Sequence, residues 1–551
     1  MHKVIIKLFL IALLLASCGI RKSILDKPNL DSYSVSKTKR IIINDSLFFN
    51  KNSSLRKNKF GQWELVAFGE NPLDLGNNVG SLTEELIIKQ ERIFLDKINQ
   101  LVPSKFKQKL LRKFLTIYNR KIHLYIKEEY KAEIYGVSSY ASDEFNNFAD
   151  KYILSLYLHS AHDIGHALQD LALVGCSSFA VWNENTVDGN LLIARNFDFY
   201  AGDEFSKEKI ISFIQPEKGY KFMSVSWGGM VGVMSGMNEA GLTITINAGK
   251  SDIPLLAKTP ISLVTREILQ YASNIEEAIT IAKNKSVFVS ESIMVGSAED
   301  NKAILIEISP KNFGVYDVEY SSKLICSNHF QSNAYNEDKK NKKHIIESHS
   351  KYRFDRMTEL LEGEQITPSK AVAILRNKEG LDNKKIGYGN EKALNQLLAH
   401  HGIVFQPHKK MVWISSNPYQ LGEFVAFQLD SVFKNAKSKK TSLSIANLVI
   451  EKDSFLNSEE YNDYENFRIE NKEINTVIND ERTLNSEQIK NFIALNPDYW
   501  EVYYLVGKYY YKKKKYQLSL NFLEKALTKE VTTAFDKKMI EKYIKKSKRR
   551  I

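Results

Sequence analysis

A change in the pattern of apolar residues at Cys176 limits most strongly how this chain can fold. Before this position, residues 81–125 place apolar side chains three and four residues apart, as amphipathic helices do, and residues 144–173 also have a helical pattern. After it, apolar and polar residues alternate, with many β-branched and aromatic side chains, which is typical of strands. Strands, then helices, then strands again predict a layered α+β body rather than alternating βαβ units.

Two hairpins begin the strand-rich part of the chain. The first turns at residues 185–189 and the second at residues 238–241. Further elements follow in order: an amphipathic helix at 261–285, strands at 292–300, 302–310 and 313–328, helices at 345–362 and 368–377, a hairpin at 402–418 and one more strand within 422–433. We therefore expect the body to span residues 176–435.

The first residues predict export and a lipid anchor. A basic start is followed by an apolar run at residues 8–15, which is too short to span a bilayer and suits a signal peptide. Residues 15–18 read Leu-Ala-Ser-Cys and resemble a bacterial lipobox, which implies cleavage before Cys18 and acylation of that residue. We expect a signal peptide at residues 1–17, a polar, lipid-anchored tether at residues 18–60, and attachment to a membrane of the bacterial cell envelope. An ordinary signal peptide with a chance cysteine is the alternative.

Charge and cysteine content narrow the classes of function. The net charge is +12, but much of it lies in residues 537–550, and no basic stripe interleaved with aromatic residues occurs elsewhere, so nucleic acid is not an expected partner. The three cysteines are Cys18, Cys176 and Cys326. With Cys18 acylated, a disulfide framework is not expected, although a bridge between the other two is an alternative. A lone cysteine at position 176 of an exported protein therefore requires an explanation.

A separate helical region is predicted at the C-terminus, over residues 436–551, after a charged stretch at residues 435–445. Within it, residues 484–529 predict two helices joined near residues 512–515, with apolar and small residues at spacings that resemble a tetratricopeptide (TPR) pair. A single repeat cannot bury its own faces, so it should dock on the body or on a protein partner. A plain helical hairpin is the alternative.

Reactive groups are predicted to meet where the first hairpin begins. Gly175 and Cys176 lie where a helical segment gives way to a strand, and the turn brings Arg195 and Asp198 back beside them. A nearby cation favours the thiolate, which is the nucleophilic form of cysteine. A carboxylate would instead orient a protonated amine. The alternative is that Cys176 is a small core residue and that Arg195 and Asp198 form a structural pair.

The segment GCSSFAVWNENTVDGNLLIARNFDF resembles the nucleophile hairpin of cysteine N-terminal-nucleophile (Ntn) hydrolases. It is most similar to the acyl-coenzyme A:6-aminopenicillanic acid acyltransferase family, with choloylglycine hydrolase and penicillin V acylase as more distant relatives. The resemblance extends from about Glu133 to about Leu429, and further motifs follow in the family's order: MNEAGLTITIN at 237–247, CSNHF at 326–330, YRF at 352–354 and WISSNPYQLGEF at 413–424. It implies a four-layered αββα fold, with residues 61–175 as a helical propeptide or small chain and residues 176–435 as the catalytic domain.

The resemblance implies that Cys176 is the nucleophile and that the chain cuts itself between Gly175 and Cys176. The α-amine that the cut frees would be the base, because its pKa of about 7.7–8.0 lets it take the thiol proton near neutral pH. Arg195 would polarise the thiol and Asp198 would hold the amine. Gly175 has no side chain to obstruct attack on its carbonyl group.

Three further residues align with the family's site. Asn247 and Asn328 correspond to asparagines of the oxyanion hole, which stabilise a tetrahedral intermediate by donating from their amides. Arg353 corresponds to an arginine that braces the site, with the neighbouring Arg356 as the alternative. Cys326 differs from the family's usual residue and is expected to pack in the interior.

The activity that the resemblance implies is cleavage of linear amide bonds, or acyl transfer, through an acyl-thioester on Cys176. The substrate would be a small acyl amide or acyl thioester, and neither a metal nor an organic cofactor is required. An alternative of another class is a non-catalytic envelope lipoprotein that uses the TPR-like end to bind a partner.

The histidines offer no competing site in the sequence. His159, His162 and His166 share one predicted helical face, but with a single carboxylate nearby a surface helix is expected rather than a metal site. His400 and His401 precede the last hairpin and are expected to be loop residues.

Overall fold

The computed structural model describes most of the chain, namely residues 23, 25–34, 39–146, 149–160, 163, 174–252, 256–436, 438 and 442–551. The predicted signal peptide at residues 1–17 and the predicted acylation site Cys18 lie outside these residues, as do His162 and His166. Among the helices within them, none has both the length and the apolar character needed to cross a bilayer.

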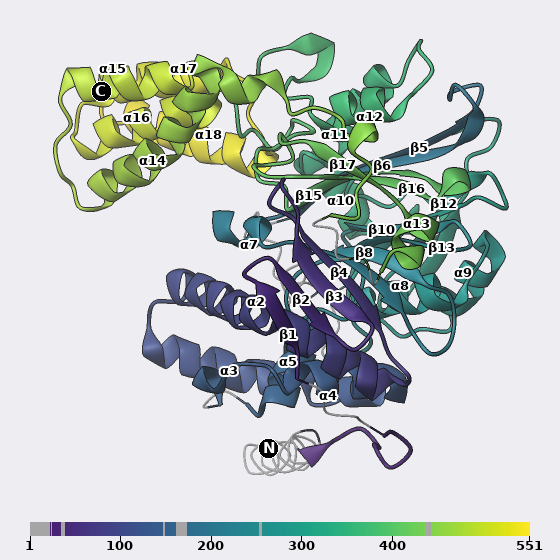
Figure 1. The fold of residues 1–551 in the computed structure, drawn as a ribbon. Helices are drawn as coiled ribbons and strands as arrows, with labels where there is room; N and C mark the ends of the chain where they lie inside the picture. The colour runs from purple at the N-terminus through teal and green to yellow at the C-terminus, as the bar shows by residue number, and fades with distance from the viewer. Residues whose placement is uncertain are drawn as a thin grey trace, which may run out of the picture.

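Two β-sheets form the centre of the molecule (Figure 1). The larger has 11 strands in the order β1 (Ile41–Asn44), β2 (Leu47–Asn50), β3 (Ser53–Lys57), β4 (Trp63–Phe68), β7 (Ile210–Gln215), β8 (Phe222–Ser226), β9 (Ser235–Asn238), β10 (Leu242–Ala248), β11 (Glu291–Ser297), β12 (Lys302–Ile308) and β13 (Phe313–Tyr316). The smaller has six strands in the order β14 (Lys323–Cys326), β5 (Val174–Asn183), β6 (Gly189–Phe199), β15 (His401–Gln406), β16 (Met411–Ser415) and β17 (Phe424–Gln428). The helices and strands together confirm the predicted α+β class.

The two sheets face each other across a core of alternating apolar side chains. Strand β6 shows the alternation. Leu191 and Ile193 lie in the core that both sheets share, whereas Leu192 and Ala194 belong to a separate apolar cluster with helical side chains. That cluster is covered by α11 (Ser350–Leu360) and α12 (Pro368–Leu375). Both faces of the smaller sheet are therefore buried.

A second group of helices packs on the other face of the larger sheet. They are α2 (Pro72–Leu101), α3 (Lys105–Asn119), α4 (Glu128–Ser138), α5 (Lys151–His159), α8 (Ile261–Tyr271) and α9 (Ile275–Lys283). Helix α2 begins where the Asn71 side chain accepts a hydrogen bond from the Asp74 backbone, with Pro72 in the first turn, where proline loses no helical hydrogen bond. Shorter helices are α7 (Asp203–Lys207), α10 (Lys339–Glu347) and α13 (Leu429–Lys434).

The predicted tether is wrong for residues 41–57. These residues form β1 to β3, and β4 follows in the region expected to be helical. Their short apolar stretches, IIIN and LFFN, are separated by single turns and diluted by Asn, Ser and Lys. The overall polar composition therefore concealed a meander of edge strands.

The larger sheet joins the two parts of the chain that lie on either side of Gly175 and Cys176. Strands β4 and β7 pair in parallel, from Trp63 opposite Ile210 to Phe68 opposite Gln215. Strands β1 to β4 thus belong to the segment before the predicted cut, and β7 to β13 to the segment after it. A chain cut at this point would keep one continuous sheet.

The C-terminal region is helical, as predicted, and packs on the body (Figure 1). It comprises α14 (Glu459–Asn479), α15 (Ser486–Leu495), α16 (Trp500–Lys512), α17 (Tyr516–Leu527) and α18 (Ala534–Lys548). Helices α16 and α17 meet closely at Gly507, where an added Cβ would lie 2.7 Å from Leu523 Cγ. Asn390 of the body donates to the Glu530 carbonyl at 2.9 Å, so this region docks on its own chain.

The boundary predicted at residue 436 lies too early. Leu443 is buried in the core between the sheets, and its backbone donates to Glu64 at 2.8 Å. Ile450 pairs with Phe424 of β17. Apolar residues hidden among the lysines of this stretch therefore keep it on the body.

A buried ion pair is expected to hold α4 to α8, across the predicted cut. Arg266 donates to both carboxylate oxygens of Glu133, at 3.2 and 2.9 Å, and the two side chains are 2% and 5% exposed. Arg266→Met should lower the free energy of unfolding by about 3–5 kcal/mol, because it leaves a buried carboxylate without its cation. Urea unfolding measures this. Lys311→Met is the control, since its pair with Asp252 is exposed and should contribute less than about 1 kcal/mol. Equal losses in the two variants would contradict the prediction.

Candidate active site

Cys176 lies in strand β5, where that strand pairs with β6. It stands opposite Phe197, and Ser178 stands opposite Arg195. Residues opposite each other in an antiparallel pair share a face, so the side chains of Cys176 and Arg195 point the same way, toward the larger sheet. The chain is continuous through Gly175, and the Cys176 side chain is 1% exposed. A thiol at this position lies inside the molecule.

The Arg195 guanidinium contacts the thiol directly. Its Nη2 donates to Cys176 Sγ at 3.5 Å and also to the Ile246 carbonyl. Its Nη1 donates to the Met234 carbonyl at 3.0 Å and to the Ser235 hydroxyl. Burial raises the pKa of the Cys176 thiol, and the Arg195 cation opposes that rise. The predicted partnership of Cys176 and Arg195 is present as a contact.

Asp198 lies on the other face of β6. It stands opposite Gly175, so its carboxylate lies beside the backbone of residues 175 and 176 rather than beside the thiol. The side chain is fully buried, and within the described part of the chain neither oxygen has a hydrogen-bond partner. Burial raises the pKa of Asp198 to about 7, against the opposing cations of Arg353 and Arg195. The position suits a group that binds the backbone nitrogen of Cys176 once that nitrogen becomes an amine.

Asn328 holds the backbone of Cys176. Its Oδ1 accepts from the Cys176 backbone N–H at 3.0 Å, and its Nδ2 donates to the Ala248 carbonyl at 3.0 Å. An amide nitrogen has two protons, so, counting only partners in the described ranges, one N–H of Asn328 stays available to a reacting oxygen.

Asn247 differs from Asn328 in this respect. Its Nδ2 donates to the carbonyls of Cys326 and Ser327, both at 3.1 Å, and its Oδ1 accepts from Ser178 at 2.8 Å. Both amide protons are therefore used within the fold, and the side chain ties β10 to β5 and to the end of β14.

Arg353 rather than Arg356 reaches the site from α11. It donates to the Cys176 carbonyl at 2.5 Å, to the Ser177 hydroxyl at 2.8 Å and to Asn328 Oδ1 at 2.5 Å. Arg356 turns away and donates to Asn377, Glu359 and Asn383. A single buried guanidinium thus braces both strand β5 and Asn328.

Ser235, His401 and His400 form a chain behind Arg195 that the sequence did not reveal. The expected loop assignment holds for His400 and is wrong for His401, which begins β15; both histidines are buried. Ser235 Oγ lies 2.9 Å from His401 Nε2, and the two Nδ1 atoms of the histidines are 2.9 Å apart. Ser235 accepts from Arg195 and has one proton of its own to donate, and burial lowers the pKa of His401 well below its usual range, so a neutral His401 is available as a neighbour of that hydroxyl. The chain thus connects Arg195 through Ser235 to two buried histidines.

Other expectations are settled by burial. His159 is 1% exposed and accepts from the Val231 backbone at 2.9 Å, so the predicted surface position is wrong for it. Cys326 is buried with a free thiol, like Cys176, so the two do not form a bridge. Gln396 was missed: an added Cβ at Gly175 would lie 2.7 Å from its Nε2, so its amide group lies next to the predicted scissile bond.

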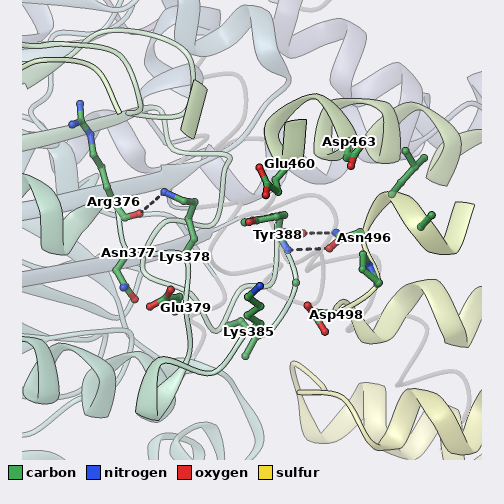
Figure 2. Close-up of a pocket in the computed structure, with 15 residues that line it drawn as sticks. Arg376, Asn377, Lys378, Glu379, Lys385, Tyr388, Glu460, Asp463, Asn496 and Asp498 are labelled. Atoms are coloured by element: carbon green, nitrogen blue, oxygen red, sulfur yellow. Dashed lines mark hydrogen bonds between the residues drawn. The ribbon is translucent and has the colours of Figure 1, made fainter. Parts of the chain in front are cut away.

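A separate pocket of about 380 Å³ lies between the body and the C-terminal helices (Figure 2). Its charged side chains come from both parts and include Arg376, Lys385, Glu460 and Asp498. None of the predicted site residues lines it. The pocket is therefore distinct from the surroundings of Cys176.

The chain is similar to proteins of known families. The family model described as acyl-coenzyme A:6-aminopenicillanic acid acyl-transferase matches residues 182–418, a span that begins after Cys176 and includes the other five predicted site residues. An uncharacterized protein of Archaeoglobus fulgidus is 27% identical over 263 residues, which are 44% of this chain and 42% of that protein. Protein dcd1B of Dictyostelium discoideum is 27% identical over 157 residues, 28% of this chain and 31% of that protein. This chain thus spans less than half of these curated relatives.

Among solved structures, similarity is found to a Caenorhabditis elegans ortholog of N-acylethanolamine-hydrolyzing acid amidase and to a mutant conjugated bile acid hydrolase from Clostridium perfringens. The first is 16% identical with a TM-score of 0.31, covering 42% of this chain and 93% of the other. The second is 17% identical with a TM-score of 0.31, covering 46% and 92%. The comparison with known proteins therefore rests on the family model, and that match agrees with the resemblance that the sequence motifs indicated.

Proposed function

We propose that this protein is a self-cleaving cysteine Ntn-type enzyme that hydrolyses linear amide bonds or transfers acyl groups through Cys176. The observation that carries the proposal is the arrangement around one residue. The Cys176 thiol touches a buried guanidinium. Its backbone nitrogen donates to Asn328, and the residue opposite Gly175 is Asp198, whose buried carboxylate has no hydrogen-bond partner among the described residues. A small core cysteine needs neither feature.

Self-cleavage would proceed by attack of the Cys176 thiol on the Gly175 carbonyl carbon. The bond between the Gly175 carbon and the Cys176 nitrogen breaks, the nitrogen takes up the thiol proton and becomes an amine, and Gly175 is left as a thioester on the sulfur. Water then opens the thioester and leaves a carboxylate on Gly175. Arg353, which donates to the Cys176 carbonyl and to Asn328, would keep this segment in place.

In the mature protein the freed α-amine would act as the base. It takes the thiol proton as the sulfur attacks the substrate carbonyl, and the Asp198 carboxylate holds the resulting ammonium group. Arg195 stabilises the thiolate, and the available N–H of Asn328 donates to the oxyanion of the tetrahedral intermediate. The ammonium group then gives its proton to the leaving amine, and an acyl-thioester remains on Cys176.

The substrate class follows from this chemistry and from the family match. A small acyl amide or acyl thioester would supply the acyl group, and water is the proposed acceptor in an envelope compartment. The facing sheets with helices on their outer sides support a four-layered αββα arrangement. Anchoring through a lipid on Cys18, and a TPR-like role for α16 and α17, remain part of the proposal.

A trapped acyl-enzyme tests the function. The purified protein is mixed with a panel of N-acyl amides that differ in acyl chain and is quenched in acid. The mass of the chain beginning at Cys176 should then rise by one acyl group, and the amine should be released in solution. A protein that releases no amine and carries no adduct with any member of the panel is better explained as a non-catalytic scaffold.

Asp198→Asn is expected to stabilise the uncut chain in a pH-dependent way. The pKa of Asp198 is about 7 in the folded chain and about 3.9 when unfolded, so between these values the folded state binds the extra proton and stability falls as pH rises. Asparagine removes this loss, which amounts to about 2–4 kcal/mol above pH 7 and vanishes near pH 4. Urea unfolding of both chains in a Cys176→Ala background, at several pH values, measures the difference.

Asp252→Asn is the matched control for this measurement. Hydrogen bonds from Lys311 and Lys340 lower the pKa of Asp252 to about 2, so its removal should cost a little stability above pH 4 instead of adding any. A gain from Asp198→Asn that is equal at pH 5 and pH 8 would show that the Asp198 carboxyl group is not the source.

A further inference from the structure

Helix α3 carries an apolar stripe that no described part of the chain covers. Phe106, Leu110 and Phe114 are 77%, 61% and 50% exposed, and they follow one another at four-residue steps, so they lie on one face. Ile117, which is 40% exposed, extends the same face by a turn. Large apolar side chains seldom line up in this way on a surface in contact with water alone.

Cations border this stripe on both sides. On a helical projection Lys109 and Lys113 lie along one edge and Lys107 along the other, and all three are exposed. Residues 105–121 contain seven lysines and arginines and no acidic residue. The exposed face of α3 therefore combines an apolar centre with a basic rim.

The C-terminal end of α3 is fixed to the body. Tyr118 is buried, its ring meets Phe288 edge-on at 6.0 Å, and its carbonyl accepts from Ala257 at 3.0 Å. The helix is thus anchored at this end, where Tyr118 also stacks on Phe114 at 5.7 Å, while Phe106 and Leu110 lie further from the anchor and stay exposed. In Figure 1, α3 lies at the end of the molecule opposite to helices α14 to α18.

We propose that α3 lies in the surface of an anionic lipid bilayer, with Phe106, Leu110 and Phe114 among the acyl chains. A helix with a strong apolar face and a lysine-rich polar face binds in the plane of such an interface. The long lysine side chains at its edges reach the level of the lipid phosphates while their stems stay in the apolar layer. This contact is independent of the chemistry at Cys176 and of acylation at Cys18.

The charges favour lipid over the other occupants of such a face. Protein interfaces are depleted in lysine, whereas here lysines border the stripe on both sides. A second copy of the chain would bring seven cations against seven. An anionic bilayer instead gains from each of them, by about fivefold in partition coefficient for each lysine near the surface.

The test places a fluorescent reporter on the helix of the full chain. Cys18→Ala removes a reactive thiol, and Cys176 and Cys326 are buried, so Leu110→Cys can be labelled selectively with a dye that shifts to the blue in apolar surroundings. Leu518→Cys on α17 is the control, because Leu518 is also an exposed leucine, at 41%. Since the dye senses only its own surroundings, binding through the N-terminus leaves it unchanged.

With vesicles of phosphatidylcholine and phosphatidylglycerol, the dye at position 110 should shift to the blue and the dye at 518 should not. Phosphatidylcholine alone, or high salt, should abolish the shift. Lys109→Gln with Lys113→Gln should weaken partitioning about 25-fold, while the equal charge change Lys542→Gln with Lys545→Gln leaves it unchanged.

Three results would overturn the proposal. The first is no shift at position 110 with anionic vesicles. The second is the same loss of partitioning from both lysine pairs, which would mean a diffuse charge effect. The third is a dimer in light scattering that Leu110→Ser dissolves, which would assign the stripe to a second copy of the chain.

Discussion

Replacing Cys176 with alanine should leave the chain uncut and without activity. Without the thiol no thioester can form at Gly175, and the α-amine that we propose as the base is never freed. The wild-type protein should instead contain a fragment of about 43 kDa beginning at Cys176, in proportion to 63.2 kDa for 551 residues. Intact-mass measurement and N-terminal sequencing of both proteins decide the matter.

The natural control for this experiment is Cys326→Ala. Cys326 is a second buried free thiol, and its strand pairs with β5 at Ser178. Its loss should change neither cleavage nor activity. If the wild type stays whole after purification, the base is missing and a scaffold function becomes the better explanation. If Cys176→Ala is cut at the same bond, another group performs the cleavage.

Asn328→Ala and Asn247→Ala should cause different defects, the first mainly in kcat and the second mainly in stability. The available N–H of Asn328 is the proposed donor to the oxyanion, so its loss should reduce kcat by about 10²–10³-fold. Asn247 uses both amide protons and its oxygen inside the fold, so its loss leaves buried groups unsatisfied and costs about 1–3 kcal/mol of stability for each.

The two measurements are kcat of the matured variants and urea unfolding of the same variants in the uncut Cys176→Ala background. Asn328→Ala should show the greater loss of kcat and Asn247→Ala the greater loss of stability. The reverse pattern would assign the oxyanion to Asn247 and a bracing role to Asn328.

The hairpin that carries Cys176, Arg195 and Asp198 was predictable because its information is local. Two segments that alternate apolar and polar residues, joined by one turn, bring these residues together independently of the rest of the chain. The choice between Arg353 and Arg356 was not local. Both lie on α11, three residues apart, and only the docking of the helix on β5 and β14 shows which one faces the nucleophile.

The features that escaped prediction depend on contacts between distant parts of the chain. Strand β4 finds its partner β7 across 147 positions, from Trp63 to Ile210, and no periodicity within β4 announces that pairing. His401 likewise takes its role from Ser235, 166 positions away. The polar composition around residues 41–57 suggested a tether. Composition alone does not show that a sheet has an open edge with which these residues can pair.

The parallel pairing of β4 with β7 affects how a protein cut at Gly175 would unfold. Before the cut, folding is a reaction within one molecule. After the proposed cut, the same sheet would be completed by two chains, so the midpoint of unfolding should depend on protein concentration and refolding should be second order. A separated N-terminal chain would present β4 as an unpaired edge, open to association with other chains. The cut would therefore make unfolding hard to reverse. The lifetime of the protein would then depend on how slowly its two chains separate.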